Sequence, residues 1–343
     1  MSNNYAPVII TTLNRHEHFK RLIESLRRNT YANKTDIYVG LDFPKTDSHV
    51  DGYNKITEYL SQSFEEFRSF TVIKRTVNYG STRNGMDLRD LVFSKYDRFI
   101  RTDDDAEFSP NFLEYMNKCL DEYENDEDVI AVTGYSYPLK WKISDSATVF
   151  KENFICPMWG TGFWTKKYRK LEEIIISNHF LNKEARTAIL KGGFNNMTDV
   201  CKQEFADLCL SPDFKITLAS IVTDISVRMY MAICNKYVVM PTTSKVRNWG
   251  FDGSGEFCSD VTKETRSVTA KTYSYHLQTI DENDSFSLIC DLLYDSKVNR
   301  RIMNAFDPIS ISQKILTYIK VILFVLLGNG LFTKLTLLIR KIR

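Results

Sequence analysis

Short apolar runs alternate with amphipathic segments along the first third of the chain. The runs are rich in β-branched residues and cover residues 7–13, 36–42, 70–74, 98–102 and 129–133, which predicts five strands. Between them apolar side chains recur every three or four positions, as expected for helices with one buried face. One of these helices is expected around residues 88–93, after a turn-rich segment at 78–85. This alternation predicts an α/β fold, with a Rossmann-like and mostly parallel sheet flanked by helices.

The pattern is less regular in the second half. A helix is predicted over residues 221–237 and a strand over 238–241, while 245–255 has the composition of a flexible loop. The aromatic, glycine-rich segment 156–164 fits a loop or short strand that lines a cleft. Its Trp159 and Trp164 either form a platform for a sugar or pack in the core.

Three consecutive carboxylates, Asp103, Asp104 and Asp105, directly follow the predicted strand 98–102. A helix is expected to begin just after them, with Ser109 as its N-cap and Pro110 in its first position. Carboxylates at the end of a buried strand repel one another unless a cation lies among them. Two interpretations remain open here: an acidic turn that caps the helix, or a site for Mg²⁺ or Mn²⁺ and a diphosphate.

Composition and charge narrow the class of protein. With 43% hydrophobic and 26% charged residues the chain resembles folded globular proteins, and its net charge of +2 does not indicate a nucleic-acid binder. Its seven cysteines are scattered without a Cys-x-x-Cys pair, which favours reduced thiols over a disulfide framework or a zinc site. The N-terminus lacks the basic and apolar regions of a signal peptide, so a cytoplasmic location is expected.

Residues 306–343 form an apolar and basic tail. From Ile309 onward they contain six basic residues and no acidic one. Only 13 residues separate Lys320 from Lys334, fewer than the roughly 20 that span a membrane, and the Gly-Asn-Gly sequence at 328–330 should break a helix. Two short amphipathic helices on the membrane surface are therefore predicted for residues 309–343, attached peripherally at the inner face of the cell membrane. The alternative is an apolar patch covered by a protein partner.

The order of these motifs from Val8 to about Gly255 resembles that of the GT-A fold glycosyltransferases. The acidic segment 101–116 is especially similar to the Glu-Asp-Asp segment of the family 13 β-1,2-N-acetylglucosaminyltransferases, in which a helix also follows the triplet. Residues 9–15 and 78–85 are similar to the family 2 inverting glycosyltransferases. The resemblance implies a GT-A catalytic domain over residues 1–305, with a donor half at about 1–135 and an acceptor half at about 136–305.

The resemblance also implies a role for each residue of the first half that matches a family motif. Arg15 would lie near the uracil and phosphates of a UDP-sugar donor, and Asp42 would recognise the uracil. Asp103 and Asp104 would contact the donor's sugar and ribose, and Asp105 would be the protein side chain that coordinates Mn²⁺ or Mg²⁺. The family begins its triplet with Glu, where this chain has the shorter Asp103.

The second half adds two further residues by the same resemblance. Asp224 matches the family's catalytic base at the start of a helix, and Arg247 begins a segment, 247–255, where the family has a loop that orders over the bound donor. From the residues alone, Asp224 also fits an ordinary helix N-cap, and Asp42 a plain turn. The implied activity is metal-dependent, inverting transfer of a sugar, expected to be N-acetylglucosamine, from a UDP-sugar to a membrane-associated glycan or lipid-linked acceptor.

Two other functions fit parts of the sequence. A sugar nucleotidyltransferase has a related sheet and uses carboxylate-bound Mg²⁺. It is disfavoured because residues 11–15, after the first strand, contain no glycine and hence no glycine-rich phosphate loop. The other alternative is a carbohydrate-binding protein that kept the fold and lost turnover. An acidic triplet accompanied by a base favours an enzyme.

Overall fold

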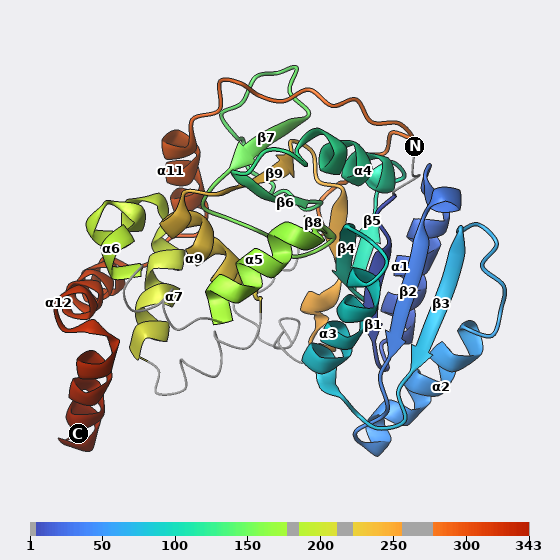
Figure 1. The fold of residues 1–343 in the computed structure, drawn as a ribbon, viewed down its shortest axis with the longest axis horizontal. Helices are drawn as coiled ribbons and strands as arrows, with labels where there is room; N and C mark the ends of the chain where they lie inside the picture. The colour runs from blue at the N-terminus through green and yellow to red at the C-terminus, as the bar shows by residue number, and fades with distance from the viewer. Residues whose placement is uncertain (1–4, 177–184, 211–221, 256–276, 343) are drawn as a thin grey trace.

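The protein is described by a computed structural model over residues 5–176, 185–210, 222–255 and 277–342 (Figure 1). Eight strands form one sheet in the order β3-β2-β1-β4-β8-β6-β9-β7. Their bounds are β1 Val8–Thr12, β2 Asp36–Leu41, β3 Ser69–Lys74, β4 Arg98–Asp103, β6 Val129–Thr133, β7 Val149–Glu152, β8 Thr161–Trp164 and β9 Tyr237–Pro241. Two short strands, β5 (Ala106–Phe108) and β10 (Val246–Asn248), pair separately as an antiparallel ribbon.

The strand directions bring most carboxyl ends to one edge of the sheet. β1 pairs in parallel with β2 and β4, and β2 in parallel with β3. β8 is antiparallel to both β4 and β6, so β6 runs in the same direction as β4, and β9 is parallel to β6. The predicted mostly parallel α/β sheet is confirmed, and all five predicted strands of the first half are present. Ligands of such sheets bind at the carboxyl edge.

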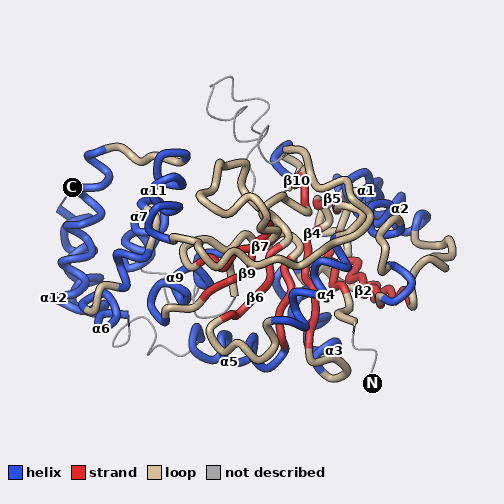
Figure 2. Tube along the Cα trace, turned by 90° about the horizontal axis from the view of Figure 1, so that it is seen from above, coloured by secondary structure: helices blue, strands red, loops and turns tan. Residues whose placement is uncertain are grey.

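Helices cover both faces of the sheet (Figures 1 and 2). Alternate residues of β1 divide between two cores, because successive side chains of a strand point to opposite faces. Val8 and Ile10 pack in the core that contains α1 and α4, while Ile9 packs in the core that contains α3 and α9. The helix bounds are α1 His16–Arg27, α2 Val50–Tyr59, α3 Gly80–Phe93, α4 Phe112–Glu122, α5 Thr165–Ile176, α6 Ala185–Leu190, α7 Asp199–Leu210, α9 Asp224–Cys234, α11 Ser296–Phe306 and α12 Ile311–Ile342.

Two predicted helix starts are wrong. α4 begins at Phe112 with Asn111 as its N-cap, not at Ser109 and Pro110, because the Ser109 hydroxyl bonds the Asn111 side chain and Pro110 lies in a turn. The helix expected near residues 88–93 begins earlier, at Gly80, within a segment predicted to be turn-rich. Its first backbone N–H groups are held by Asp42, a residue too distant in the sequence for local composition to indicate.

The predicted helix at 221–237 is shorter in the structure. α9 starts at Asp224 behind a capping box, in which the Thr223 side chain accepts from the Ser226 N–H and Ser226 bonds back to Thr223. It ends at Asn235, whose φ of 51° lies in the left-handed region that terminates helices. Residue 221 lies outside the described residues.

The C-terminal helix α12 lies at the end of the molecule opposite α1 and α2 (Figure 2). Its predicted break is confirmed, because Gly328 has non-helical angles (φ 69°, ψ 165°). By length and composition, Ile311–Gly328 is the one helix among the described residues that could cross a membrane, and 22% of it is buried in the protein. The buried residues of this stretch are Thr317, Val321, Phe324 and Gly328.

Candidate functional site

The acidic triplet lies at the carboxyl end of β4, beside the end of β1. The Arg15 guanidinium, at the start of α1, donates to both Asp104 and Asp105, with 2.9 Å between Arg15 Nη1 and Asp105 Oδ2. The other oxygen of Asp104 accepts from the Thr12 hydroxyl at 2.8 Å. β1 and β4 are neighbours in the sheet, so Arg15 and the triplet meet although about 90 residues separate them.

Asp105 has one carboxylate oxygen without a partner. Oδ1 is buried and accepts no hydrogen bond from any described residue. Burial raises the pKa of Asp105 to about 7; the Arg15 charge lowers it, and the charges of Asp103 and Asp104 raise it further. A buried oxygen of this kind raises the free energy of the folded protein unless a cation or a hydrogen-bond donor contacts it.

This oxygen fits one ligand position of a hard divalent cation, which prefers oxygen donors. No group of three or more metal-binding side chains occurs among the residues that the structure describes, so these residues alone do not enclose an ion. The residues fit a cation held by Asp105 and completed by water and the oxygens of a diphosphate. That arrangement is common for Mg²⁺ sites, which take one or two carboxylates plus phosphate oxygens.

A loop after β10 closes over Asp105. The Trp249 N–H donates to the Asp105 carbonyl at 2.8 Å, and a Cβ atom added to Gly250 would lie 2.0 Å from Asp105 Oδ2. His18 on α1 contacts this loop, with Nε2 3.2 Å from both Asp252 Oδ2 and the Trp249 carbonyl. His18 could not be selected from the sequence, because it belongs to no motif and meets the loop only in the fold. Gly250 lies inside the predicted loop 247–255, but its close approach to Asp105 could not be predicted from the sequence.

Asp42 is buried at the end of β2 and holds the start of α3. Its two oxygens accept from the backbone N–H groups of Phe43, Tyr79 and Gly80 at 2.8–2.9 Å, and from the Asn78 side chain at 3.3 Å. These bonds give Asp42 a structural role that the predicted uracil contact did not include. Recognition of a base by Asp42 stays a prediction.

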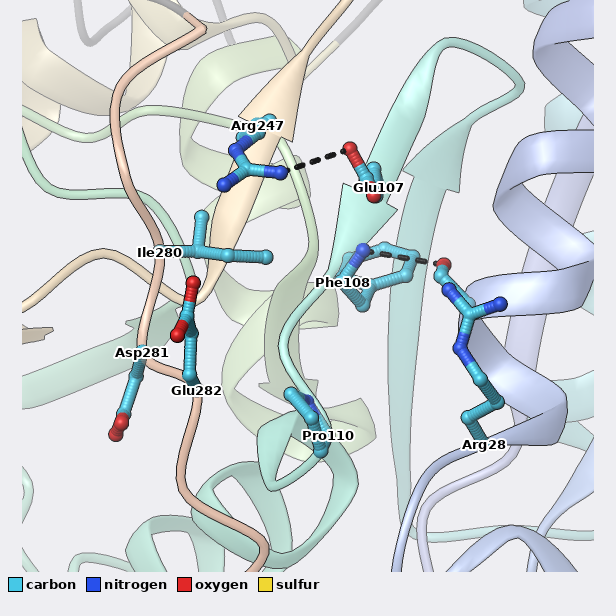
Figure 3. Close-up of a pocket in the computed structure, with 9 residues that line it drawn as sticks. Arg28, Glu107, Phe108, Pro110, Arg247, Ile280, Asp281 and Glu282 are labelled. Atoms are coloured by element: carbon cyan, nitrogen blue, oxygen red, sulfur yellow. Dashed lines mark hydrogen bonds and ion pairs between the residues drawn. The ribbon is translucent and has the colours of Figure 1, made fainter.

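Arg247 lies on β10 and faces Glu107 on β5, with 3.4 Å between Arg247 Nη1 and Glu107 Oε2 (Figure 3). Both line a cavity of about 140 Å³ that also contains Arg28, Asp281 and Glu282. Small-molecule sites usually have volumes of roughly 300–1,000 Å³, so this cavity is too small for a sugar nucleotide. Among the described contacts of Arg247, none is with the triplet; its predicted donor contact is untested.

Asp224 is the first residue of α9, which leads into β9. Because β9 is parallel to β6, the start of α9 lies toward the carboxyl edge of the sheet. The side chain is 52% exposed and pairs with Arg228 at 3.1 Å, and Arg228 also pairs with Glu204 at 2.9 Å. Thr223, not Asp224, is the N-cap, so the alternative interpretation of Asp224 as an N-cap is wrong.

Asp224 and Arg101 both influence the thiol of Cys156, in the segment before β8. Burial raises the pKa of the Cys156 thiol to about 12, and Asp224 also raises it, while Arg228 and Arg101 lower it. Arg101 is on β4, two residues before the triplet. The role of Asp224 as the catalytic base stays a prediction.

The two tryptophans of segment 156–164 differ in burial. Trp164 is 3% exposed, and its Nε1 donates to the Leu120 carbonyl at 3.0 Å, so it belongs to the core. Trp159 is half-buried. The core interpretation is confirmed for Trp164, and a sugar platform remains open for Trp159.

Comparison with solved structures finds distant likenesses. A crystal structure of TarS 1–349 from S. aureus has a TM-score of 0.38 at 11% identity, covering 93% of this chain and 80% of that one. The mannosyltransferase PcManGT from Pyrobaculum calidifontis, in complex with GDP-Man and Mn²⁺, has a TM-score of 0.34 at 18% identity, covering 49% and 46%. The chain spans only 29% of the longer TarS structure. These scores are too low to transfer any ligand or residue role.

Comparison with protein families is more informative. No curated protein matches the chain. The sequence profile of glycosyl transferase family 2 matches residues 8–189, which is more than half of the chain and includes Arg15, Asp42 and the triplet. Asp224 and Arg247 lie beyond the matched segment. The resemblance to family 13 is not confirmed. The protein belongs to glycosyl transferase family 2 and is a glycosyltransferase with a GT-A type α/β fold.

Proposed function

We propose that the protein is a metal-dependent, inverting glycosyltransferase that uses a UDP-sugar, with N-acetylglucosamine as the sugar. The observation that carries this proposal is Oδ1 of Asp105, which is buried beside Arg15 at the carboxyl edge of the sheet and accepts no hydrogen bond from the residues that the structure describes. A buried carboxylate oxygen next to a fixed cation is suited to a bound ion pair such as a metal–diphosphate.

The donor end is built from Arg15 and the triplet. Arg15 places a guanidinium where it can pair with diphosphate oxygens, and Asp103 and Asp104 lie beside it to contact the sugar and ribose. Asp105 would hold Mn²⁺ or Mg²⁺, which when bound offsets the negative charge that develops on the leaving diphosphate. Asp42 would recognise the base, and Arg247 would contact the donor after movement of the loop.

The acceptor end is built around Asp224. The half-exposed carboxylate accepts the proton of the acceptor hydroxyl while that oxygen forms a bond to the anomeric carbon. The bond from that carbon to the diphosphate oxygen breaks at the same time, and the nucleoside diphosphate leaves with its electron pair. A single displacement inverts the anomeric centre, so an α-linked donor gives a β-linked product.

Two neighbouring variants separate a chemical role of Asp224 from a structural one. Asp224→Asn should keep UDP binding in Mn²⁺ and lose about 10²–10⁴-fold of transfer, because the amide cannot take the proton. Thr223→Ala should keep transfer but lower the free energy of unfolding by about 1 kcal/mol, through loss of the cap. Transfer is measured as incorporation of radiolabelled N-acetylglucosamine into a membrane preparation from the source cells. Undiminished transfer by Asp224→Asn would remove it as the base.

We also propose that the acceptor is a membrane-associated glycan or a lipid-linked glycan. The support comes from α12, whose outward face includes five Ile and Leu residues that are 49–77% exposed: Ile311, Ile315, Ile319, Ile322 and Leu326. The opposite stripe packs on α7, where Lys320 pairs with Asp207.

A helix with one face held by protein and an apolar face in contact with solvent fits the surface of a bilayer, lying in its interface. The six basic residues from Ile309 onward favour an anionic leaflet, at the inner face of the cell membrane.

Vesicle flotation tests this attachment with the full chain. The triple variant Ile315→Glu, Ile319→Glu and Leu326→Glu should no longer float with vesicles that contain phosphatidylglycerol, since it places three carboxylates on the outward face. The control is Leu292→Glu, at a leucine that is 91% exposed elsewhere on the surface. Equal flotation of the triple variant and the control would contradict attachment through this face.

A further inference from the structure

A row of five aromatic rings runs along the carboxyl edge of the sheet. Phe251 meets Trp159 at a centroid distance of 5.8 Å, and Trp159 meets Tyr135 at 4.8 Å. Tyr135 meets Tyr137 at 5.2 Å, and Tyr137 meets Phe306 at 6.4 Å. The rings come from four separate connections, namely the segment after β6, the segment before β8, the loop after β10 and the end of α11.

The row differs from the core in its burial. Phe251, Trp159, Tyr137 and Phe306 are all half-buried, whereas Tyr135 is fully buried. Trp159 and Tyr137 each meet Tyr135 edge to face, at interplanar angles of 89° and 85°. The buried ring therefore fixes the orientation of the two partly exposed rings on either side of it. Preorganised rings of this kind lose little conformational entropy when a ligand binds.

The two ends of the row lie toward the two predicted chemical centres. Phe251 follows Gly250, which lies against the Asp105 carboxylate. At the other end, the side chain of Asn304, two residues before Phe306, accepts from the Asp199 N–H at the start of α7 at 2.8 Å. Further along α7, Glu204 pairs with Arg228, the partner of Asp224. Burial lowers the pKa of Arg228, and Tyr137 is among the groups whose charge raises it. The row thus leads from the predicted metal ligand to the predicted base.

The chemistry around the row selects one class of ligand. Carboxylates of Asp224, Glu204 and Asp307 lie at its far end, and an acyl chain there would desolvate them at high cost. A polyanion would be repelled by the same groups. A neutral sugar chain fits, because pyranose rings have apolar C–H faces that pack on aromatic rings and hydroxyls that donate to carboxylates.

We propose that the aromatic row binds a neutral oligosaccharide acceptor of at least two sugar residues, which places its reacting hydroxyl at Asp224. This inference rests on the proposed function of Asp224 and the triplet, and it deepens that function by naming the acceptor class.

Binding to an array of neutral, acidic and monosaccharide glycans tests the inference, using the full chain with UDP and Mn²⁺. Wild type should bind neutral oligosaccharides more strongly than the monosaccharides. Trp159→Ala and Phe306→Ala should each weaken that binding by roughly tenfold or more, because truncated aromatic anchors commonly cost this much. Trp159→Phe should retain most of the binding, since it keeps a ring in the row. Tyr237→Ala is the matched control, at a half-buried ring on the amino edge of the same sheet.

Titration of UDP in Mn²⁺ on the same samples separates this inference from the proposed function. If wild type fails to bind UDP, the proposed donor site is wrong. If UDP binding is intact but wild type binds no neutral oligosaccharide, or Trp159→Ala and Phe306→Ala bind as wild type does, the aromatic row is not the acceptor site. Preference for acidic glycans over neutral ones would overturn the assigned class as well.

Discussion

One carboxylate oxygen of Asp105, Oδ2, accepts a hydrogen bond from Arg15, and the other, Oδ1, accepts none from a described residue. Arg15 and Gly250 fix the position of Oδ2, while Oδ1 stays buried without a donor among the described residues. A bound ion, a water molecule or a catalytic role commonly accounts for a buried oxygen in this state. The environment of Oδ1 therefore supports a cation at Asp105 more directly than the acidic composition of the triplet does.

The close approach of Gly250 gives a sharp test at this scale. Gly250→Ala should lower the affinity for UDP in Mn²⁺ by roughly tenfold or more, because its Cβ would lie 2.0 Å from Asp105 Oδ2 and displace the carboxylate or the loop. The control is Gly85→Ala on α3, where the added Cβ meets only the Thr11 methyl group at 3.6 Å. Calorimetric titration of UDP measures both variants. Unchanged affinity in Gly250→Ala would show that the loop does not constrain Asp105.

At the scale of elements, β2 and β3 are joined at their amino ends by an ion pair between the buried Asp36 and the partly exposed Arg68. Asp36 is the first residue of β2, and it accepts hydrogen bonds from Arg68, Ser69 and Tyr96. Burial raises the pKa of Asp36, but these three bonds outweigh it and lower the pKa to about 2. The charged form of Asp36 therefore stabilises the pairing of these strands.

This pKa predicts how stability depends on pH. The stabilisation is present above the unfolded-state pKa of 3.8 and is lost as pH falls through the folded-state pKa of about 2. Asp36→Asn should therefore lower the free energy of unfolding by about 2 kcal/mol near neutral pH, and by less as pH falls below about 4. Urea denaturation of both proteins across this pH range measures the difference. A deficit that is the same at all pH values would contradict the assigned cause.

Sequence patterns predicted which strands and helices occur in the first half of the chain better than they predicted the residues at which these elements begin and end. The five strands could be found because each is a short apolar run with a buried environment. The start of α3 could not, because Asp42 caps it from 38 residues away. β5, β8 and β10 were also missed or left undecided, since strands of three or four residues have no measurable periodicity.

At the scale of the whole molecule, the fold gathers residues from distant parts of the chain. Arg15, the triplet and Asp224 all lie toward the carboxyl edge because the strands that lead to or from them run in the same direction. Their order along the chain could be predicted by resemblance, whereas the aromatic row could not, because its rings come from four connections with unrelated sequences. Membership of glycosyl transferase family 2 removes the nucleotidyltransferase alternative.

The most direct test of the account is a calorimetric titration of UDP, with and without Mn²⁺, on wild type and Asp105→Asn. GDP and CMP serve as competing nucleotides, and Asp51→Asn, at an exposed carboxylate on α2, is the control. We predict that Mn²⁺ strengthens binding of UDP to wild type and to Asp51→Asn, with UDP preferred over GDP and CMP, and that Asp105→Asn loses the effect of the metal. UDP affinity that is indifferent to Mn²⁺ in wild type, or equally metal-dependent in Asp105→Asn, would contradict the assignment of Asp105 as the metal ligand.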